Sequence, residues 1–315
     1  FGLIPRAHRC IFVLNELPDL QPRIQVSLFS ILEEKEIQIR GFKVRLPLDI
    51  QFIFTSNPED YTNRGSIVTP LKDRIGSQIL THYPESVDIA KTITGQESKL
   101  NSETISKIYI PEIARDIIEQ VSFEARESEL VDKKSGVSAR MSITSLQNLV
   151  SSAERRMLIN KEEITSIRMS DFNSVISSIN GKVELVYEGE EEGAEQVSYN
   201  LISDAVKTLF IKYFPKIEKL TKPDEISVYD SILEWFTVNQ VILRDDLTNK
   251  DYESILNKVK DAELILNKFI PDIDKKDKLF FIEFLLWGLE SFNKLTIMRT
   301  NNGVEFKDPF NNFIN

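Results

Sequence analysis

Apolar and polar positions in the first 83 residues alternate in blocks that predict an α/β domain. Two short apolar runs, at residues 10–14 and 50–56, are each bounded by polar turns. Such runs are typical of strands buried on both faces of a parallel sheet. We therefore expect two neighbouring parallel strands in this part of the chain.

A helix and a hairpin are predicted between these two strands. Residues 21–36 have apolar positions at helical spacing, which predicts an amphipathic helix. The residues expected on its buried face are Ile24, Leu28, Ile31 and Leu32. Residues 36–46 alternate around Gly41, a pattern that favours a β-hairpin inserted between the helix and the second strand.

The remainder of the chain has mainly helical spacing. Residues 84–165 predict a small helical domain, and residues 166–315 predict a mostly helical region. Helical patterns in the latter lie near residues 196–214, 225–240, 249–269 and 275–293. Trp235 and Trp287 fall in apolar helical stretches, so core packing is expected for both. The acidic run at 188–195 is interpreted as a solvated linker or a helix start.

Composition narrows the possible classes of protein. The 315 residues carry a formal net charge of −10, which disfavours non-specific nucleic-acid binding. A single cysteine, Cys10, excludes an internal disulfide, fits a reducing cytoplasm and is expected to be a buried, inert thiol. With only two histidines, a structural zinc site is not expected. No apolar run approaches the roughly 18 residues of a membrane span.

Polar residues at the ends of the two predicted strands are the candidate site. Asn15 and Glu16 follow the first strand, and Asn57 lies at the end of the second. Open parallel sheets bind ligands at the carboxyl ends of their strands. Two arginines, Arg74 and Arg140, follow later, and arginine suits the charge that develops on a transferred phosphoryl group.

These segments, in this order, resemble AAA+ ATPases of the group that contains the magnesium-chelatase I subunit and the MoxR-type chaperones. The stretch "GLIPRAHRCIFVLNELPDL" resembles the Walker B segment, and "ILEEKEIQIRGFKVRLP" resembles the hairpin insertion. "FTSNPEDYTNRGSIVTPLKDRIG" resembles the sensor strand with the arginine finger, and "SGVSARMSITSLQNLVSSAERR" resembles the lid helix with the second sensor. The resemblance covers about residues 1–165 and is looser beyond them.

The resemblance implies a fold and a set of roles. The fold would be the C-terminal part of an AAA+ P-loop core (residues 1–83), a helical lid (84–165) and a mostly helical C-terminal region (166–315). ATP and Mg²⁺ would be the cofactors, and a homo-oligomeric ring, a hexamer, would remodel or assemble a client protein. That client could carry a metal-dependent adhesion domain.

The implied site residues fall on both sides of an interface between subunits. Glu16 would activate the attacking water, and Asn57 would be the first sensor. Arg74 would act as an arginine finger on the nucleotide of the adjacent subunit. Arg140 would be the second sensor, and Asn15 occupies the metal position of the Walker B segment. Arg64 lies in the same loop as Arg74 and has no assigned role.

The chain departs from the family pattern at two places. It contains no Gly-x-x-x-x-Gly-Lys-[Ser/Thr] phosphate-binding loop, so the chain as given is expected to be inactive and truncated at its N-terminus. Asn15 stands where the family has Asp. A neutral amide accepts a hydrogen bond from a metal-bound water but adds no negative charge, so weaker magnesium binding is expected.

Several alternatives stay open at the level of sequence. Asn15 and Glu16 could simply cap the following helix, and Arg74 could form an ion pair with Asp73 or a nearby carboxylate. The chain could be a non-hydrolysing scaffold or the motor subunit of a metal chelatase. A motor acting on alternative sigma factors is disfavoured because a Gly-Ala-Phe-Thr-Gly-Ala run is missing. A truncated core would also leave an apolar sheet face uncovered, which predicts association or poor solubility.

Overall fold

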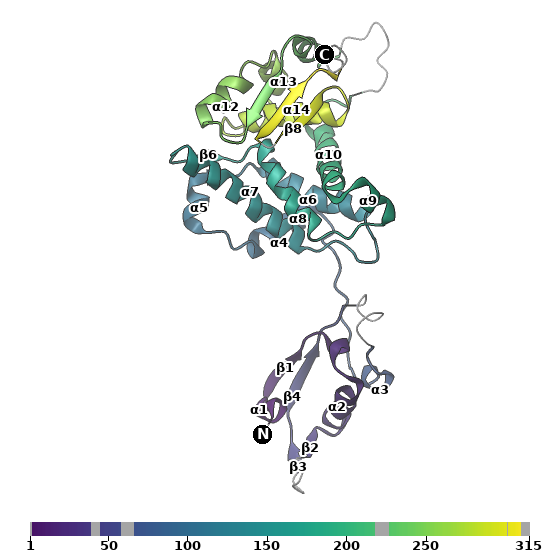
Figure 1. The fold of residues 1–315 in the computed structure, drawn as a ribbon. Coiled ribbons are helices and arrows are strands. Elements are labelled where there is room, and N and C mark those ends of the chain that lie inside the picture. The colour runs from purple at the N-terminus through teal and green to yellow at the C-terminus, as the bar shows by residue number, and fades with distance from the viewer. Residues whose placement is uncertain (1, 39–44, 58–65, 218–226, 301, 310–315) are drawn as a thin grey trace. The chain divides into compact units, whose positions relative to one another are not determined.

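The computed structural model divides the chain into two compact units, residues 1–82 and 83–315 (Figure 1). It describes residues 2–38, 45–57, 66–217, 227–300 and 302–309. The predicted lid and C-terminal region both fall in the second unit, and their division at residue 165 stays a prediction.

Two parallel strands form the centre of the first unit. β1 (Cys10–Leu14) pairs with β4 (Ile50–Phe54), and their register aligns Leu14 with Phe54. The two predicted strands are therefore present, parallel and adjacent. The other elements of this unit are α1 (Leu3–Arg6), η1 (Leu17–Asp19), α2 (Pro22–Glu34), β2 (Glu36–Gln38), β3 (Arg45–Pro47) and α3 (Thr69–Lys72).

Only one face of the β1–β4 pair is covered. Leu14, Phe52 and Phe54 pack on a small core that includes residues of α2, while Ile11 and Val13 on the other face are 64% and 51% exposed. The expectation of strands buried on both faces is wrong for the described residues, because α2 covers a single side. Cys10 is the first residue of β1 and is also exposed, because the small core contacts this strand at Leu14 and does not include Cys10, so the expectation of a buried thiol is also wrong. The expected uncovered apolar face is therefore present, and the association expected from it stays a prediction.

Helix α2 lies beside the strands with a buried face that differs in one position from the predicted one (Figure 1). Leu28 and Ile31 are buried as expected, but Ile24 is 42% exposed and the neighbouring Gln25 is fully buried. Gln25 is buried because its amide groups replace the hydrogen bonds that water would otherwise provide, as shown below.

The predicted hairpin is present as an antiparallel pairing of β2 with β3. Glu36 aligns with Pro47 and Gln38 with Arg45. The predicted turn at Gly41 lies outside the described residues.

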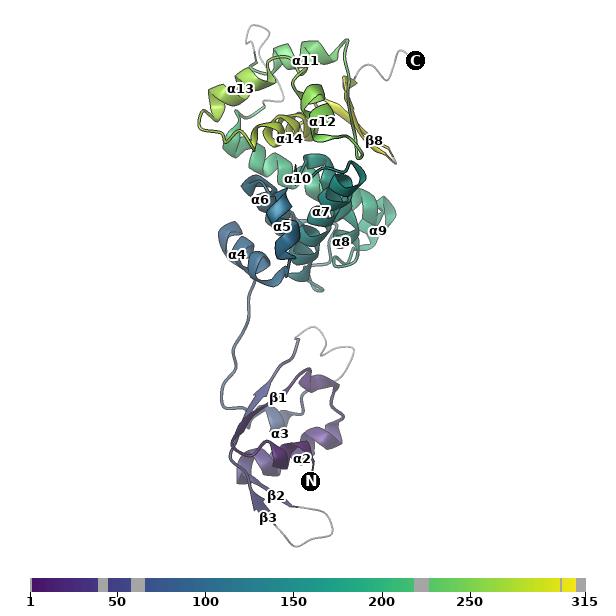
Figure 2. The ribbon, with the colours of Figure 1, turned by 90° about the vertical axis from the view of Figure 1, so that its left-hand side faces the viewer.

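The second unit is built mainly from helices around one continuous apolar core. Its N-terminal elements are α4 (Val87–Glu97), α5 (Ser102–Lys107), β5 (Ile108–Tyr109), α6 (Glu112–Glu127), α7 (Arg140–Ile159), β6 (Thr165–Ser166), η3 (Met169–Val175) and α8 (Ile176–Asn180). Its later elements are α9 (Tyr187–Glu192), α10 (Ala194–Tyr213), α11 (Asp230–Phe236), β7 (Val241–Arg244), α12 (Asn249–Leu256), α13 (Ala262–Phe269), α14 (Lys278–Ser291), β8 (Thr296–Thr300) and β9 (Gly303–Lys307). Helices α6, α7 and α10 pack side by side (Figure 2).

Helix α14 is the centre of this core, as its apolar composition predicts. Trp287 is 1% exposed, whereas Trp235 is half-buried against the core. Gly288 allows α14 to approach α10 closely, because a Cβ there would lie 2.0 Å from the ring of Phe210. The acidic run covers most of the short helix α9, which ends at Glu192, and the first turn of α10, which contains Glu195.

A three-stranded antiparallel sheet in the C-terminal region was not predicted. Its order is β7–β9–β8, with β8 and β9 forming a hairpin. The predicted helix at 249–269 is also divided into α12 and α13, with Asp261 in the left-handed backbone region between them. Short strands with few residues on each face give a weak periodic signal, which explains the omission.

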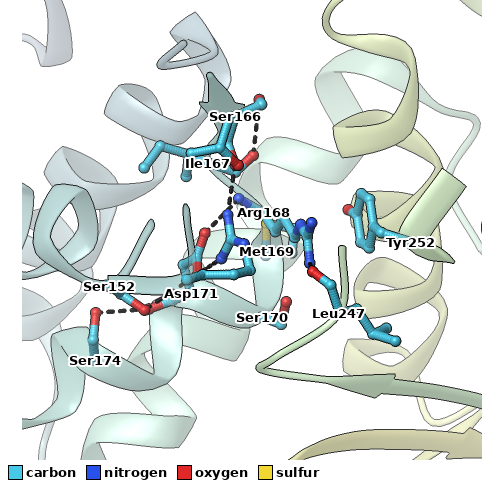
Figure 3. A network of polar contacts seen from close by, with 12 residues as sticks. Ser152, Ser166, Ile167, Arg168, Met169, Ser170, Asp171, Ser174, Leu247 and Tyr252 are labelled. Carbon is cyan, nitrogen blue, oxygen red and sulfur yellow. Dashed lines mark hydrogen bonds and ion pairs between the residues drawn. The ribbon is translucent and has the colours of Figure 1, made fainter. Parts of the chain in front are cut away.

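A buried polar network fastens η3 to the C-terminal elements (Figure 3). Asp171 forms an ion pair with Arg156, and its second oxygen accepts a hydrogen bond from the backbone N–H of Arg168 at 2.8 Å. The guanidinium of Arg168 lies over the ring of Tyr252 and donates to the carbonyl oxygen of Leu247 at 3.0 Å. The network therefore joins segments on both sides of the predicted boundary at residue 165.

Glu283 of α14 completes this network. Its carboxylate accepts hydrogen bonds from the backbone N–H groups of Met169 and Ser170 at 3.0 and 2.8 Å, and from the hydroxyl of Tyr252 at 2.6 Å. Burial raises the pKa of the Glu283 carboxyl, while the hydrogen bonds from Tyr252 and Met169 and the charge of Arg168 oppose the shift.

Replacing Tyr252 with phenylalanine is expected to destabilise the protein by about 1.5–3 kcal/mol, because a buried carboxylate loses one donor. Denaturant unfolding of the Tyr252→Phe variant measures this loss. Tyr199→Phe is the matched control, since the Tyr199 hydroxyl makes a long, exposed 3.5 Å contact with Glu195. Equal stability of the Tyr252→Phe variant and the unchanged protein would contradict the role given to this network.

Within the described ranges, no helix is both long enough and apolar enough to cross a membrane.

Candidate functional site

The candidate site lies at the carboxyl edge of the β1–β4 pair. The parallel register that aligns Leu14 with Phe54 brings Asn15 and Thr55 side by side directly after the strands. The hydroxyl of Thr55 donates to Oδ1 of Asn15 at 3.3 Å, and the backbone N–H of Glu16 donates to Oγ1 of Thr55 at 3.1 Å. Thr55 thus fixes both residues of the predicted Walker B segment at this edge.

Glu16 has an unusual backbone conformation. Its φ of 52° and ψ of 58° place it in the left-handed region, which costs a residue other than glycine about 1–3 kcal/mol. Contacts with Thr55 stabilise this conformation on both sides of Glu16. The N–H of Glu16 donates to the Thr55 hydroxyl. Leu17, which follows and is fully buried, donates its N–H to the carbonyl oxygen of Thr55 at 2.9 Å. The Glu16 side chain is exposed, so a bound molecule can reach it.

Asn57 follows two residues after Thr55 on the segment that leaves the same edge, and its side chain is exposed. The carboxyl ends of both strands therefore carry the predicted residues Asn15, Glu16 and Asn57. Arg64, which was left without a role, lies outside the described residues.

Arg74 lies just after α3 and is held against α2. Its Nε and Nη2 donate to Oε2 of Glu33 at 2.9 and 2.6 Å, and its Nη1 donates to the carbonyl oxygen of Pro70 at 2.8 Å. The guanidinium also lies 5.2 Å from the centre of the Phe29 ring. The alternative of an ion pair with a nearby carboxylate is thus present, with Glu33 as the partner.

Arg140 belongs to the second unit, where it is the first residue of α7. Its side chain is exposed, and the structure shows no partner for its guanidinium among the described residues. Its backbone N–H donates to Oγ of Ser138 at 3.2 Å, which fixes the start of the helix. The two units are described separately, so no distance relates Arg140 to the edge at Glu16.

Three supporting residues were not recognised in the sequence. Thr55 and Glu33 are described above, and the third is Gln25. Its Nε2 donates to the carbonyl oxygens of Leu20 and Ser66 at 2.9 and 3.1 Å, and its Oε1 accepts from the N–H of Val68 at 2.9 Å. A polar residue inside an apolar helix face was the available signal for Gln25.

The predicted residues at this edge offer one carboxylate, from Glu16, and two amides, from Asn15 and Asn57. No group of three or more His, Cys, Asp or Glu side chains forms a cation site in the described part of the chain. At the edge, Glu16 supplies a carboxylate, while Asn15 supplies an amide oxygen that already accepts from Thr55. The 315 residues contain no Gly-x-x-x-x-Gly-Lys-[Ser/Thr] motif.

Comparison with protein families gives a match over most of the first unit. Residues 1–76 match the family model described as the Sigma-54 interaction domain, which is an AAA+ domain. The match covers the strands, the hairpin and Arg74. It agrees with the AAA+ resemblance. Its description also favours a motor that acts on an alternative sigma factor, which the missing Gly-Ala-Phe-Thr-Gly-Ala run had disfavoured.

Comparisons with curated proteins and with solved structures do not narrow the family further. A search of the curated proteins finds no match. The crystal structure of an inferred ATPase from Cytophaga hutchinsonii is 19% identical, with a TM-score of 0.25. The match covers 61% of this chain and 64% of that chain, so this chain spans less than two thirds of its length. At that TM-score the likeness supports no argument.

Proposed function

We propose that the chain is part of an AAA+ ring ATPase of the magnesium-chelatase I and MoxR type. It would couple ATP binding and hydrolysis to the remodelling or assembly of a partner protein. The observation that carries this proposal is the carboxyl edge of β1 and β4, where Thr55 holds Asn15 and Glu16 in place. The AAA+ family match over residues 1–76 supports it.

The roles of the edge residues follow from their chemistry. Bound ATP with Mg²⁺ would supply the phosphoanhydride that is cleaved. Glu16, an exposed carboxylate, would accept a proton from the attacking water. Asn57 would donate or accept a hydrogen bond to that water or to the terminal phosphate. Asn15 would orient a metal-bound water through its amide oxygen.

The two arginines would stabilise negative charge on the terminal phosphate. Arg74 would do so on the nucleotide of an adjacent subunit, which requires head-to-tail contacts that close into a ring. The resemblance suggests a hexamer. Arg140 would reach the phosphates from the lid.

Asn15 provides the test of this proposal. In the natural protein that contains these residues, Asn15→Asp is expected to lower the magnesium concentration for half-maximal ATP turnover by about tenfold, because it adds a charge beside the ion. Gln51→Glu is the control, since it adds the same charge within β4 and away from the edge.

The result also separates the motor from a non-hydrolysing scaffold. Turnover by the unchanged protein near that of the Asn15→Asp variant at saturating magnesium would exclude the scaffold. No turnover by either protein would contradict the proposed ATPase.

A motor that acts on an alternative sigma factor is the second candidate. The description of the matching family model favours it. Binding of the protein to a purified sigma factor of that class, dependent on a nucleotide analogue, would support this candidate. The motor subunit of a metal chelatase is a further version of the first candidate, and porphyrin metallation would distinguish it.

A further inference from the structure

We propose that Glu33 is a positioning residue that holds Arg74 ready for the nucleotide of a neighbouring subunit. The inference rests on the proposed function, in which Arg74 acts in trans. It arises from a stripe of three α2 side chains, Gln25, Phe29 and Glu33, spaced four residues apart. That spacing places them on one face of the helix.

All three members of this stripe contact the segment that carries Arg74. Gln25 binds the backbone of Ser66 and Val68, just before α3. Phe29 lies under the guanidinium of Arg74, and Glu33 accepts from two of its nitrogens. Helix α2 therefore fixes both the backbone that leads to Arg74 and the end of its side chain.

The hydrogen bonds leave part of the guanidinium available. Arginine has five N–H donors, and three are used, one each on Nε, Nη1 and Nη2. One N–H therefore remains on each terminal nitrogen. Such a pair can bind two oxygens of a phosphate at once. The Arg74 side chain keeps 28% of its surface exposed, so a phosphate from another subunit can approach it.

The contact between Glu33 and Arg74 orients the arginine side chain more than it stabilises the fold. Glu33 is 61% exposed, and an ion pair of this kind adds little to the free energy of folding. A free arginine side chain has many rotamers, and it would lose that rotamer entropy on meeting the phosphate. Glu33 and Phe29 remove most of that loss in advance, and the benefit is realised when the subunits assemble.

The test compares Glu33→Ala with Glu34→Ala in the natural assembled protein. Glu34 is the next residue of the same helix and carries the same charge. Glu33→Ala is expected to lower kcat by about tenfold, with nucleotide Kd and thermal midpoint unchanged, because a misplaced group slows the reaction without weakening binding. Glu34→Ala is expected to leave all three quantities unchanged.

A double variant shows whether Glu33 acts through Arg74. In a chain with Arg74→Ala, the further change Glu33→Ala is expected to have no effect on kcat. A purely structural role would lower kcat in both backgrounds and would overturn the inference. A kcat that rises in the Glu33→Ala variant would also overturn it, since Glu33 would then be restraining Arg74.

The role of Arg74 and the role of Glu33 can be contradicted independently. If Arg74→Ala leaves turnover unchanged, the proposed trans role of Arg74 is wrong. If Arg74→Ala abolishes turnover and Glu33→Ala does not change kcat, the proposed function stands and only the role of Glu33 is wrong.

Discussion

Arg74→Ala is expected to lower ATP turnover by about 10³-fold or more while leaving nucleotide affinity nearly unchanged, as for other arginines supplied in trans. The guanidinium would meet charge that develops only as the phosphoryl group is transferred, so its loss affects the transition state rather than binding. Steady-state turnover and the Kd of a fluorescent ATP analogue, measured on the same preparation, separate the two effects.

Arg45→Ala is the control for the arginine finger. Arg45 belongs to the hairpin strand β3 and forms a longer surface ion pair with Glu36 at 3.5 Å. Loss of an exposed ion pair has little effect on folding, so the Arg45→Ala variant is expected to keep both its stability and its turnover. Turnover that is unchanged by Arg74→Ala would remove Arg74 from the site.

Glu16→Gln is expected to lower turnover by roughly 10²- to 10⁴-fold, because the amide keeps the size of the side chain but cannot accept the proton. ATP binding is expected to persist, so the variant should accumulate the ATP-bound form. Single-turnover hydrolysis of bound ATP measures the step directly.

Asp19→Asn controls for the loss of a nearby negative charge. Asp19 is an exposed acid three residues after Glu16, in η1. Its replacement is expected to leave turnover unchanged. Equal losses in the two variants would mean that general electrostatics, rather than proton transfer at Glu16, sets the rate.

The positions of the first two strands could be predicted because their apolar runs are continuous and end in polar residues. Their surroundings could not. The same run of residues 10–14 fits a strand covered on both faces or on one, and only the packing of α2 on a single side leaves Ile11 and Val13 exposed. The C-terminal sheet was missed although the sequence offers a turn signal there, the pair Asn302 and Gly303 between two apolar stretches; Gly303 is the first residue of β9.

The candidate residues at the strand ends could be predicted from the rule that parallel sheets bind ligands at this edge. The residues that hold them depend on register and helix phase. Thr55 meets Asn15 only because β1 and β4 pair in one register. Glu33 meets Arg74 because it shares a helix face with Gln25 and Phe29, which contact the same segment. The apolar pattern identifies Leu28 and Ile31 as buried, but it does not show that Gln25 is buried or which carboxylate lies opposite Arg74.

The central claim is that one site uses Glu16 from one subunit and Arg74 from the next. Mixing inactive Glu16→Gln subunits with inactive Arg74→Ala subunits tests it most directly. In random mixed rings, about a quarter of the interfaces would combine an intact Glu16 with an intact Arg74 across a head-to-tail contact. The account predicts that turnover returns to roughly that fraction of the unchanged protein's rate. Mixtures as inactive as the separate variants, in rings shown to contain both, would contradict it.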